Sequence, residues 1–299
     1  MDRRLFSKTL AGGTLGTTAL ALESLLPAAQ AAQSSTAEET RISIMLWTIL
    51  RDRPFEERLE KVAEAGYHAV ELVSEYKNWS EEDFRRYHQK CAELRIKVDT
   101  IAGLKHRIGD PRERDAFLAD VGAMLPIMDK LECPALIVMS GNVAPDLTPE
   151  AQHASCVEGL QRAIELVERK GITLLLENID LEENPHYYLW SVPEAFKIIE
   201  EVNHPQVKFL YDFYHAQISG GNLIAHLQKH SDKVGLVHIA DVPGRHEPGT
   251  GEINYSNIYK KLAELNYHRY VAMEFLPTGD PVKILAAARR DALKAAQGS

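Results

Sequence analysis

The chain has few cysteines, no surplus of positive charge and no long hydrophobic run. Its three cysteines (Cys91, Cys133 and Cys156) are an odd number at wide spacing, which argues against a structural disulfide. Lys and Arg number 34 against 43 Asp and Glu, and no basic patch is interleaved with aromatic residues, so we expect no nucleic-acid partner. Hydrophobic residues make up 45% of 299 residues, enough for one large core. We therefore expect a globular protein that acts on a small molecule.

The first 31 residues carry the pattern of an export signal. Arg3 and Arg4 begin an RR-x-F-x-K sequence, and the apolar run that follows ends in small residues near Ala31. This start resembles a twin-arginine signal, and the run is too short to remain as a membrane-spanning anchor. We expect residues 1–31 to be a cleavable export signal, residues 32–40 a linker, and the mature protein to be periplasmic. A disordered tail with a chance arginine pair is the alternative.

Residues 41–299 alternate short apolar runs with longer amphipathic stretches, eight times over. This alternation predicts one α/β domain, a single (β/α)8 TIM barrel. An open doubly wound sheet would need a glycine-rich turn after the first strand, and residues 47–50 (WTIL) are not such a turn. The expected strands are 41–47, 68–73, 96–101, 135–140, 172–177, 207–212, 234–239 and 270–275. The expected helices are 54–65, 81–94, 111–131, 149–170, 192–202, 223–229, 255–265 and 281–296.

Four polar residues stand near the ends of the last four expected strands. They are Glu177, Asp212, His238 and Glu274, at intervals of 35, 26 and 36 residues. One strand–helix unit of a barrel has about this length, so the side chains are expected to meet at the C-terminal mouth. Three carboxylates and one imidazole would repel one another there unless a divalent cation lay among them. Oxygen-rich ligands favour Mg²⁺ or Mn²⁺, with Co²⁺ as a further candidate.

Five more residues are placed near this mouth by their positions after other strands. His215 follows Asp212 by three residues in an expected loop, and Arg245 lies in the long loop after the seventh strand. Arg245 suits a carboxylate partner, because its guanidinium makes paired hydrogen bonds. We expect the remaining three to line the same pocket, with Trp47 as an apolar wall: Glu71, His106 and Trp47.

The loop after the seventh strand carries a resemblance to a known family. Residues 237–255, VHIADVPGRHEPGTGEINY, resemble the signature of hydroxypyruvate isomerases, which belong to the xylose-isomerase-like barrels. The resemblance covers roughly residues 41–287 and is strongest from Leu174 onward. It implies that one divalent metal is bound by Glu177, Asp212, His238 and Glu274. It also implies that Glu177 and Glu274 form the acid/base pair and that His215 and Arg245 contact substrate.

The chemistry that the resemblance implies is a metal-dependent isomerisation through an enediolate, with hydroxypyruvate and tartronate semialdehyde as the interconverted pair. Hydroxypyruvate isomerases often carry Gln where this chain has His238, and His is the residue of the ketose epimerases. A ketose 3-epimerase or an inosose-processing dehydratase or isomerase therefore stays open. So does an exported carbohydrate-binding barrel without catalysis. An endonuclease of the superfamily would need further His ligands and a basic surface. Whether the chain forms a homo-oligomer also stays open.

Overall fold

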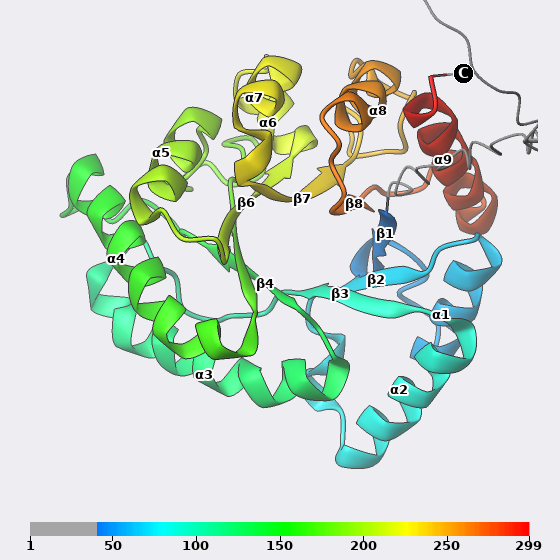
Figure 1. The fold of residues 1–299 in the computed structure, drawn as a ribbon, viewed down its shortest axis with the longest axis horizontal. Coiled ribbons are helices and arrows are strands. Elements are labelled where there is room, and N and C mark those ends of the chain that lie inside the picture. Colours follow the sequence, from blue (N-terminus) through cyan, green and yellow to red (C-terminus); the bar gives the residue numbers. More distant parts are fainter. Residues whose placement is uncertain (1–40, 299) are drawn as a thin grey trace, which may run out of the picture. The chain divides into compact units, whose positions relative to one another are not determined.

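The computed structural model describes residues 41–298, and eight parallel strands form a closed barrel in them. The strands pair in chain order, and β8 closes onto β1. Figure 1 shows them at the centre of a ring of helices, so the predicted (β/α)8 barrel is confirmed. The strands are β1 (Arg41–Met45), β2 (Ala69–Leu72), β3 (Lys97–Ile101), β4 (Ala135–Met139), β5 (Thr173–Glu177), β6 (Val207–Asp212), β7 (Val234–Ile239) and β8 (Tyr270–Met273).

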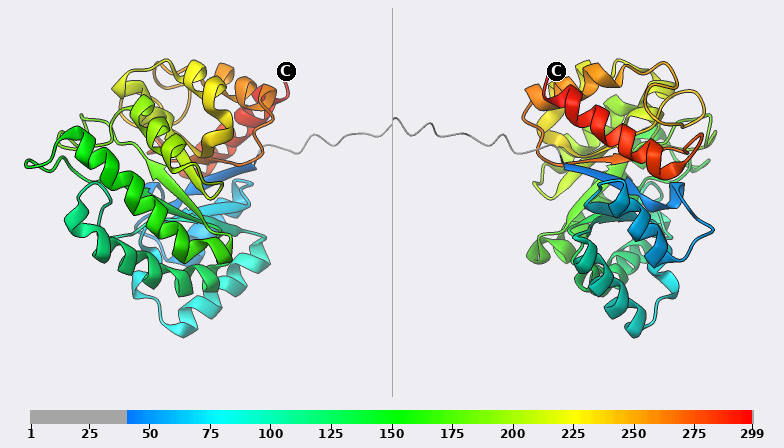
Figure 2. Two further views of the ribbon diagram at one scale, coloured as in Figure 1. Left: turned by 60° about the vertical axis from the view of Figure 1, so that its left-hand side comes forward. Right: turned by 90° about the vertical axis from the view of Figure 1, so that its right-hand side faces the viewer.

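The helices lie outside the strands, as the two further views in Figure 2 also show. Several begin with a side-chain cap: Ser80 caps α2 in a reciprocal pair with Asp83, and Thr148 caps α4 just before a proline. The α-helices are α1 (Phe55–Glu64), α2 (Glu81–Leu94), α3 (Arg114–Leu131), α4 (Pro149–Val167), α5 (Val192–Val202), α6 (Phe213–Ser219), α7 (Leu223–His230), α8 (Tyr255–Glu264) and α9 (Pro281–Ala296). Short 3₁₀ turns include η1 (Leu46–Thr48), directly after β1.

Helix α6 was not predicted from the sequence. It begins directly after β6, where the Asp212 side chain accepts hydrogen bonds from the backbone N–H groups of Tyr214 (2.7 Å) and His215 (3.3 Å). His215 therefore lies in a helix, and the prediction that placed it in a loop is wrong. The aromatic run FYH continues the apolar pattern of the strand before it, which hides the start of the helix.

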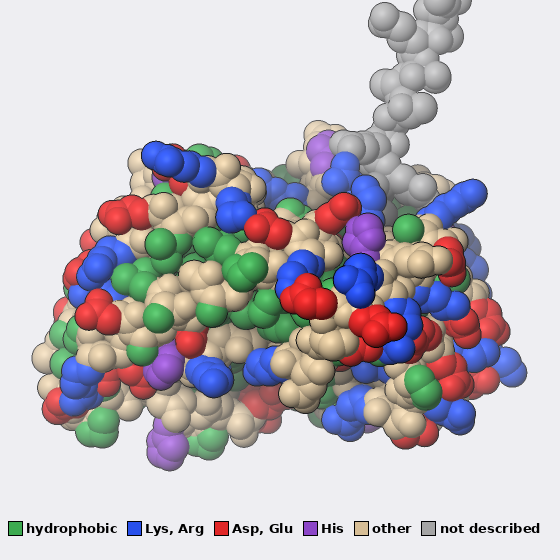
Figure 3. All heavy atoms as spheres, turned by 90° about the horizontal axis from the view of Figure 1, so that it is seen from below, with side chains coloured by type: hydrophobic (Ala, Val, Ile, Leu, Met, Phe, Trp, Pro, Cys, Tyr) green, Lys and Arg blue, Asp and Glu red, His purple; other side chains and the backbone are tan. Residues whose placement is uncertain are grey.

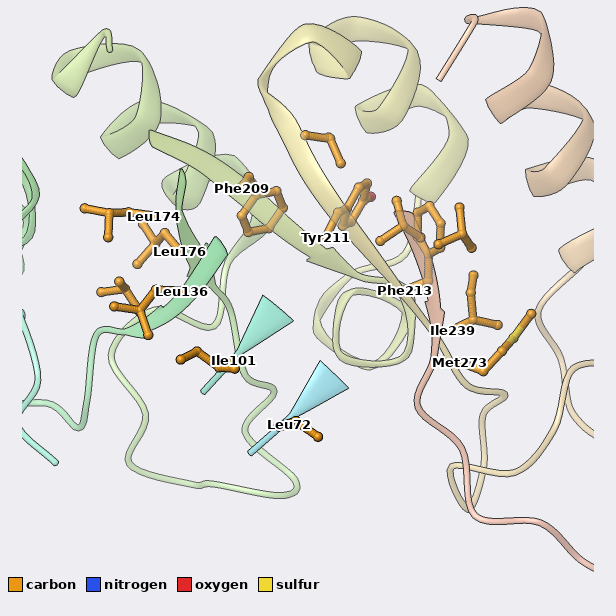
Figure 4. Close-up of a cluster of buried hydrophobic side chains, with 14 of the residues drawn as sticks. Leu72, Ile101, Leu136, Leu174, Leu176, Phe209, Tyr211, Phe213, Ile239 and Met273 are labelled. Carbon is orange, nitrogen blue, oxygen red and sulfur yellow. The ribbon is translucent and has the colours of Figure 1, made fainter. Parts of the chain in front are cut away.

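Alternation along each strand decides which side chains face the barrel axis. On β5, Leu174 and Leu176 pack outward against the helices, whereas Leu175 lies in the small inner cluster. Because successive side chains of a strand point to opposite faces, Glu177 points to the same side as Leu175. Figure 4 shows part of the outward layer, including Phe209 and the two outward leucines. The same two-residue spacing separates Leu210 from Asp212, Leu236 from His238 and Ala272 from Glu274.

The predicted export signal (1–31) and linker (32–40) lie outside the described residues. Within residues 41–298, none of the helices has the length and apolar character that a membrane crossing requires. The cysteines Cys91, Cys133 and Cys156 are buried free thiols, as the expectation of no disulfide requires.

We expect Phe209→Ala to lower the free energy of unfolding by about 3–5 kcal/mol, because it leaves a cavity between β6 and α5. The Phe209 side chain is fully buried, and its ring centroid lies 4.9 Å from that of Phe196 on α5. Urea unfolding followed by circular dichroism measures the loss. Leu166→Ala on α4, where the side chain is partly exposed, is the control. Equal unfolding midpoints for the two variants would contradict this packing.

Candidate metal centre

Glu177, Asp212, His238 and Glu274 meet at the C-terminal mouth of the barrel. Glu177 and Asp212 are the last residues of β5 and β6, His238 lies near the end of β7, and Glu274 directly follows β8. All four are buried, and one ligand atom of each lies within 4.8 Å of those of the other three. The structure thus brings together the four residues that the strand spacing singled out.

Two atoms of this group lack the hydrogen bonds that buried polar atoms normally make. His238 Nδ1 and Glu274 Oε2 are only 2.6 Å apart, yet neither makes a hydrogen bond of acceptable geometry within the described chain, although Glu274 Oε2 also forms an ion pair with Arg245 Nη2. Such orphaned buried atoms cost about 1–3 kcal/mol each unless something else binds them. Three carboxylates and one imidazole fit a divalent cation that prefers oxygen ligands. These four residues would therefore hold such an ion.

Glu71 fixes the orientation of the His238 ring from below. Its Oε2 lies 3.0 Å from His238 Nε2, and both side chains are completely buried. With Nε2 engaged by the glutamate of β2, Nδ1 is the nitrogen that faces Glu274 and Glu177, the latter at 3.9 Å. A carboxylate behind a ligand imidazole both sets its orientation and makes it a better donor. Glu71 thus supports the group from within the barrel.

Arg245 places a positive charge directly against the carboxylates. Its Nη2 lies 3.0 Å from Asp212 Oδ2 and 2.8 Å from Glu274 Oε2, and its Nη1 donates to both oxygens of Glu183 at 3.1 Å. Burial alone would lower the pKa of Arg245, but the surrounding carboxylates raise it well above its ordinary value. The guanidinium therefore stays charged and helps to offset the repulsion among the acids.

His215 is held at the edge of the group by a buried carboxylate. Asp180 Oδ2 lies 2.6 Å from His215 Nδ1, and Arg245 Nη1 lies 3.1 Å from His215 Nε2. Because a guanidinium can only donate, Nε2 accepts from Arg245, and the ring proton on Nδ1 is donated to Asp180. Both ring nitrogens of His215 are thus engaged, Nδ1 by Asp180 and Nε2 by Arg245.

Trp47 and His106 differ from each other in their placement. Trp47, in η1, is more than an apolar wall, because its Nε1 donates to Glu274 Oε1 at 2.8 Å. His106 instead lies against α3, with Nδ1 3.0 Å from Asp120 Oδ2, and 42% of its side chain is exposed. Trp47 therefore contacts one of the four residues of the group, Glu274, whereas His106 is bonded to Asp120. A substrate contact for His106 stays a prediction.

Burial and neighbouring charges shift the pKa values of Glu177 and Glu274 in opposite directions. Burial raises the pKa of Glu177 to about 7, against the lowering effect of His238 and with the help of Glu274. Burial also acts to raise the pKa of Glu274, but the charges of Arg245 and His238 outweigh it and lower the pKa below its usual range. Neighbouring carboxylates whose pKa values are driven apart are typical of acid/base pairs.

Sequence reasoning missed three residues around this group. Asp180 and Glu183 follow β5 and lie with His215 in a second set whose ligand atoms approach within 4.8 Å. They stand in an acidic run, DLEEN, in which nothing distinguishes an inward carboxylate from an exposed one. Asp241 stood in the recognised loop motif, but its partners are visible only in the fold.

Asp241 holds together the loop that carries Arg245. Its Oδ1 accepts from the backbone N–H groups of residues 242 and 253, both at 3.0 Å, and its Oδ2 from those of residues 249 and 251, at 2.8 and 3.0 Å. Gly251 must be glycine, because a Cβ there would lie 2.0 Å from the carbonyl oxygen of Val242. Arg245 itself has φ +56°, and its carbonyl accepts from the Leu276 N–H. The loop is thus fixed at both ends.

The fold and this arrangement together define a (β/α)8 barrel with a candidate divalent-cation site at its C-terminal mouth. The comparison with known families gives the class directly. The chain belongs to the xylose isomerase-like TIM barrel family, whose model matches residues 59–295.

Curated relatives of the chain are isomerases. It is 31% identical over 243 residues to the 2-oxo-tetronate isomerase of Haemophilus influenzae, covering 79% of this chain and 93% of that one. It is 29% identical over 245 residues to the hydroxypyruvate isomerase of Escherichia coli, again covering 79% and 93%. The predictions of this family and of an isomerase are confirmed.

Solved structures share the fold. The chain superimposes with a TM-score of 0.74 on a protein from Brucella melitensis described as an AP endonuclease, family 2, at 27% identity over 84% of this chain and 98% of that one. A D-psicose 3-epimerase from Clostridium cellulolyticum gives a TM-score of 0.71 at 19% identity, over 87% and 98% of the two chains. The second likeness shows the fold alone.

We expect the protein to bind one Mn²⁺ per chain and His238→Ala to weaken this binding at least about 100-fold, because it removes one of four ligands. Glu274→Gln should weaken it in the same direction and provides a second test if the histidine variant folds poorly. Isothermal titration with Mn²⁺ measures the affinity. His106→Ala is the matched control and should bind like the parent protein. Equal affinity in His238→Ala and His106→Ala would contradict the site.

We expect Asp241→Asn to lower the free energy of unfolding by about 3 kcal/mol, since an amide offers one acceptor oxygen to four N–H donors and turns its own N–H groups toward the rest. Urea unfolding measures the change. Asp232→Asn, an exposed aspartate in the turn before β7, is the control. If both variants unfold at the same urea concentration, Asp241 does not organise the loop.

Proposed function

We propose that the protein is a divalent-metal-dependent isomerase that interconverts hydroxypyruvate and tartronate semialdehyde. The observation that carries the proposal is the meeting of Glu177 and Glu274 with Asp212 and His238 in one buried group. The relatives support it, because their names specify isomerases that act on small oxo acids.

The reaction moves two hydrogens within one molecule and needs no other reactant. A proton leaves C3 of hydroxypyruvate and one arrives at C2, while the hydroxyl proton on O3 is lost and O2 gains one. The state between is an enediolate. A bound divalent cation would stabilise its negative charge as a Lewis acid, which is worth several kcal/mol. The glutamates transfer the protons: one of the pair removes the proton from C3, and the other, or a substrate hydroxyl, supplies the proton to C2.

Arg245 is the group suited to hold the substrate carboxylate. Its guanidinium is already paired with Asp212 and Glu274 on one nitrogen and with Glu183 on the other. Glu183 is the exposed member of these partners, with 40% of its side chain accessible. A substrate carboxylate can therefore take the place of Glu183 on Nη1 and still leave Arg245 anchored. His215 Nε2 can accept from a substrate hydroxyl only in place of Arg245 Nη1, because this ring nitrogen has one lone pair.

A ketose 3-epimerase is the second candidate, and His238 is the observation that favours it, because the ketose epimerases carry His at this position. The same two glutamates would then remove a proton from one carbon and return it to the opposite face. An inosose substrate would also use this pair. Binding of a carbohydrate without catalysis would leave all carbon-bound protons in place.

We expect Glu177→Gln to slow turnover by about 10²–10⁴-fold, because an amide cannot accept the carbon-bound proton. Proton NMR in deuterated buffer with Mg²⁺ measures both turnover and deuterium entry. Hydroxypyruvate, several ketoses and inosose are supplied in parallel. Glu182→Gln, an exposed neighbour in the same segment, is the control and should match the parent protein.

Deuterium in hydroxypyruvate, with tartronate semialdehyde appearing, supports the main proposal. Exchange confined to a ketose or to inosose keeps the enediolate chemistry and replaces the substrate. Unchanged activity in Glu177→Gln, or no exchange in any compound, would overturn the assignment. Removal of the metal with a chelator should abolish exchange, and added Mg²⁺ or Mn²⁺ should restore it.

A further inference from the structure

A cavity of about 550 Å³ lies on the barrel away from the candidate metal centre. Its walls include the first residues of three strands, Arg41 of β1, Lys97 of β3 and Tyr270 of β8, and one side of α2. The metal-centre residues stand at the other, C-terminal ends of the strands, and none of them lines this cavity. The cavity is therefore a separate feature. Figure 3 shows the face that carries α2 and α3, where hydrophobic side chains lie next to charged ones.

A buried carboxyl group lines this cavity with one oxygen unpartnered. Asp99 is only 3% exposed, and its Oδ2 accepts from Ser43 Oγ at 3.0 Å. Its Oδ1 makes no hydrogen bond within the described chain. Burial, reinforced by the nearby charge of Glu71, raises the pKa of Asp99 well above its ordinary value, which favours the protonated form that can donate a hydrogen bond. A buried acid without a partner is costly unless a ligand satisfies it.

Positive side chains stand at the rim beside this acid. Lys97 and Arg95 are exposed, line the cavity and form no ion pair within the described chain. Lys97 lies two residues before Asp99 on β3, so both side chains leave the same face, about 7 Å apart along the strand. The negative charge at the rim is Glu132, which is 3.4 Å from His88. Although the protein carries more acidic than basic residues overall, the two positive side chains at this rim favour the binding of an anion.

The remaining wall is apolar and aromatic. Trp79 stands 4.7 Å from Phe55 and 4.5 Å from Tyr87, measured between ring centroids, and all three line the cavity. Such rings contribute large apolar contact areas and stack on flat ligands. Burial raises the pKa of the Cys91 thiol, which also lines the cavity, to about 11. The cavity therefore offers binding contacts and no thiolate for covalent chemistry.

We propose that this cavity is a second ligand site, which takes an organic acid with an aromatic or other apolar body. The anionic head pairs with Lys97 and Arg95, a hydrogen-bond acceptor of the ligand meets Asp99, and the body lies against Trp79. A pocket that combines an apolar wall with a few convergent polar groups is the usual form of a small-molecule site. This inference does not depend on the proposed isomerase reaction.

The test uses 8-anilinonaphthalene-1-sulfonate, an aromatic anion whose fluorescence rises when it leaves water. We expect 3-phenylpropionate to displace it, and the neutral 3-phenylpropanamide to need a concentration at least about tenfold higher, the loss of about 1.4 kcal/mol of binding free energy. Equal displacement by the two compounds would contradict the proposed pairing of an anionic head with Lys97 and Arg95. A probe that does not bind, or that 3-phenylpropionate cannot displace, would overturn the proposal.

Two variants locate the probe. Lys97→Glu reverses the charge at the rim, and Ala92→Phe on α2 fills the cavity from an exposed position; each should raise the dissociation constant at least about tenfold. The matched controls are Lys260→Glu on α8 and Ala123→Phe on α3, which lie outside the cavity wall and should bind as the parent protein does. If variants and controls bind alike, the probe sits elsewhere and the proposal fails. Metal affinity should be unchanged in all four.

Discussion

The structure depends on how the barrel keeps three carboxylates together at its mouth. Glu177, Asp212 and Glu274 are buried and close, and their mutual repulsion must be offset. Arg245 supplies one positive charge by direct contact with two of them, and the imidazole of His238 stands between the glutamates. His238 Nδ1 and Glu274 Oε2 still lack hydrogen bonds within the described chain, and a divalent cation bound by the four residues would satisfy them.

Three supporting acids keep His238 and its neighbours His215 and Arg245 in place. Glu71 lies behind His238, and Asp180 lies behind His215. Asp241 accepts hydrogen bonds from four backbone N–H groups and thereby fixes the loop that carries Arg245. These supporting acids come from three different loops or strands, so the geometry of the mouth is a property of the whole barrel. Catalysis by proton transfer requires such fixed distances, because the reacting groups must lie within hydrogen-bond reach.

The two ends of the barrel offer different chemistry. At the C-terminal mouth, acidic ligand atoms are crowded around one point. At the N-terminal end, the buried Asp99 lines a cavity together with Lys97 and an aromatic wall. A buried acid whose protonated form is favoured can donate a hydrogen bond without carrying a charge, whereas grouped acids suit a cation. The same residue type thus serves two kinds of recognition because its surroundings differ.

The sequence by itself determined the barrel and the four meeting residues, because strand–helix alternation and strand-end position depend on local spacing. Eight strands were predicted within a few residues, since buried parallel strands are continuous apolar runs. Helix α6 was not predicted, because the residues FYH at its start extend the apolar run of β6. Only the side-chain cap made by Asp212 marks where the helix begins. The partners of Glu71, Asp180, Glu183 and Asp241 were decided by the tertiary structure. Their contacts join residues up to 167 positions apart, and a contact over that distance depends on how the strands pair and twist, which no local pattern records.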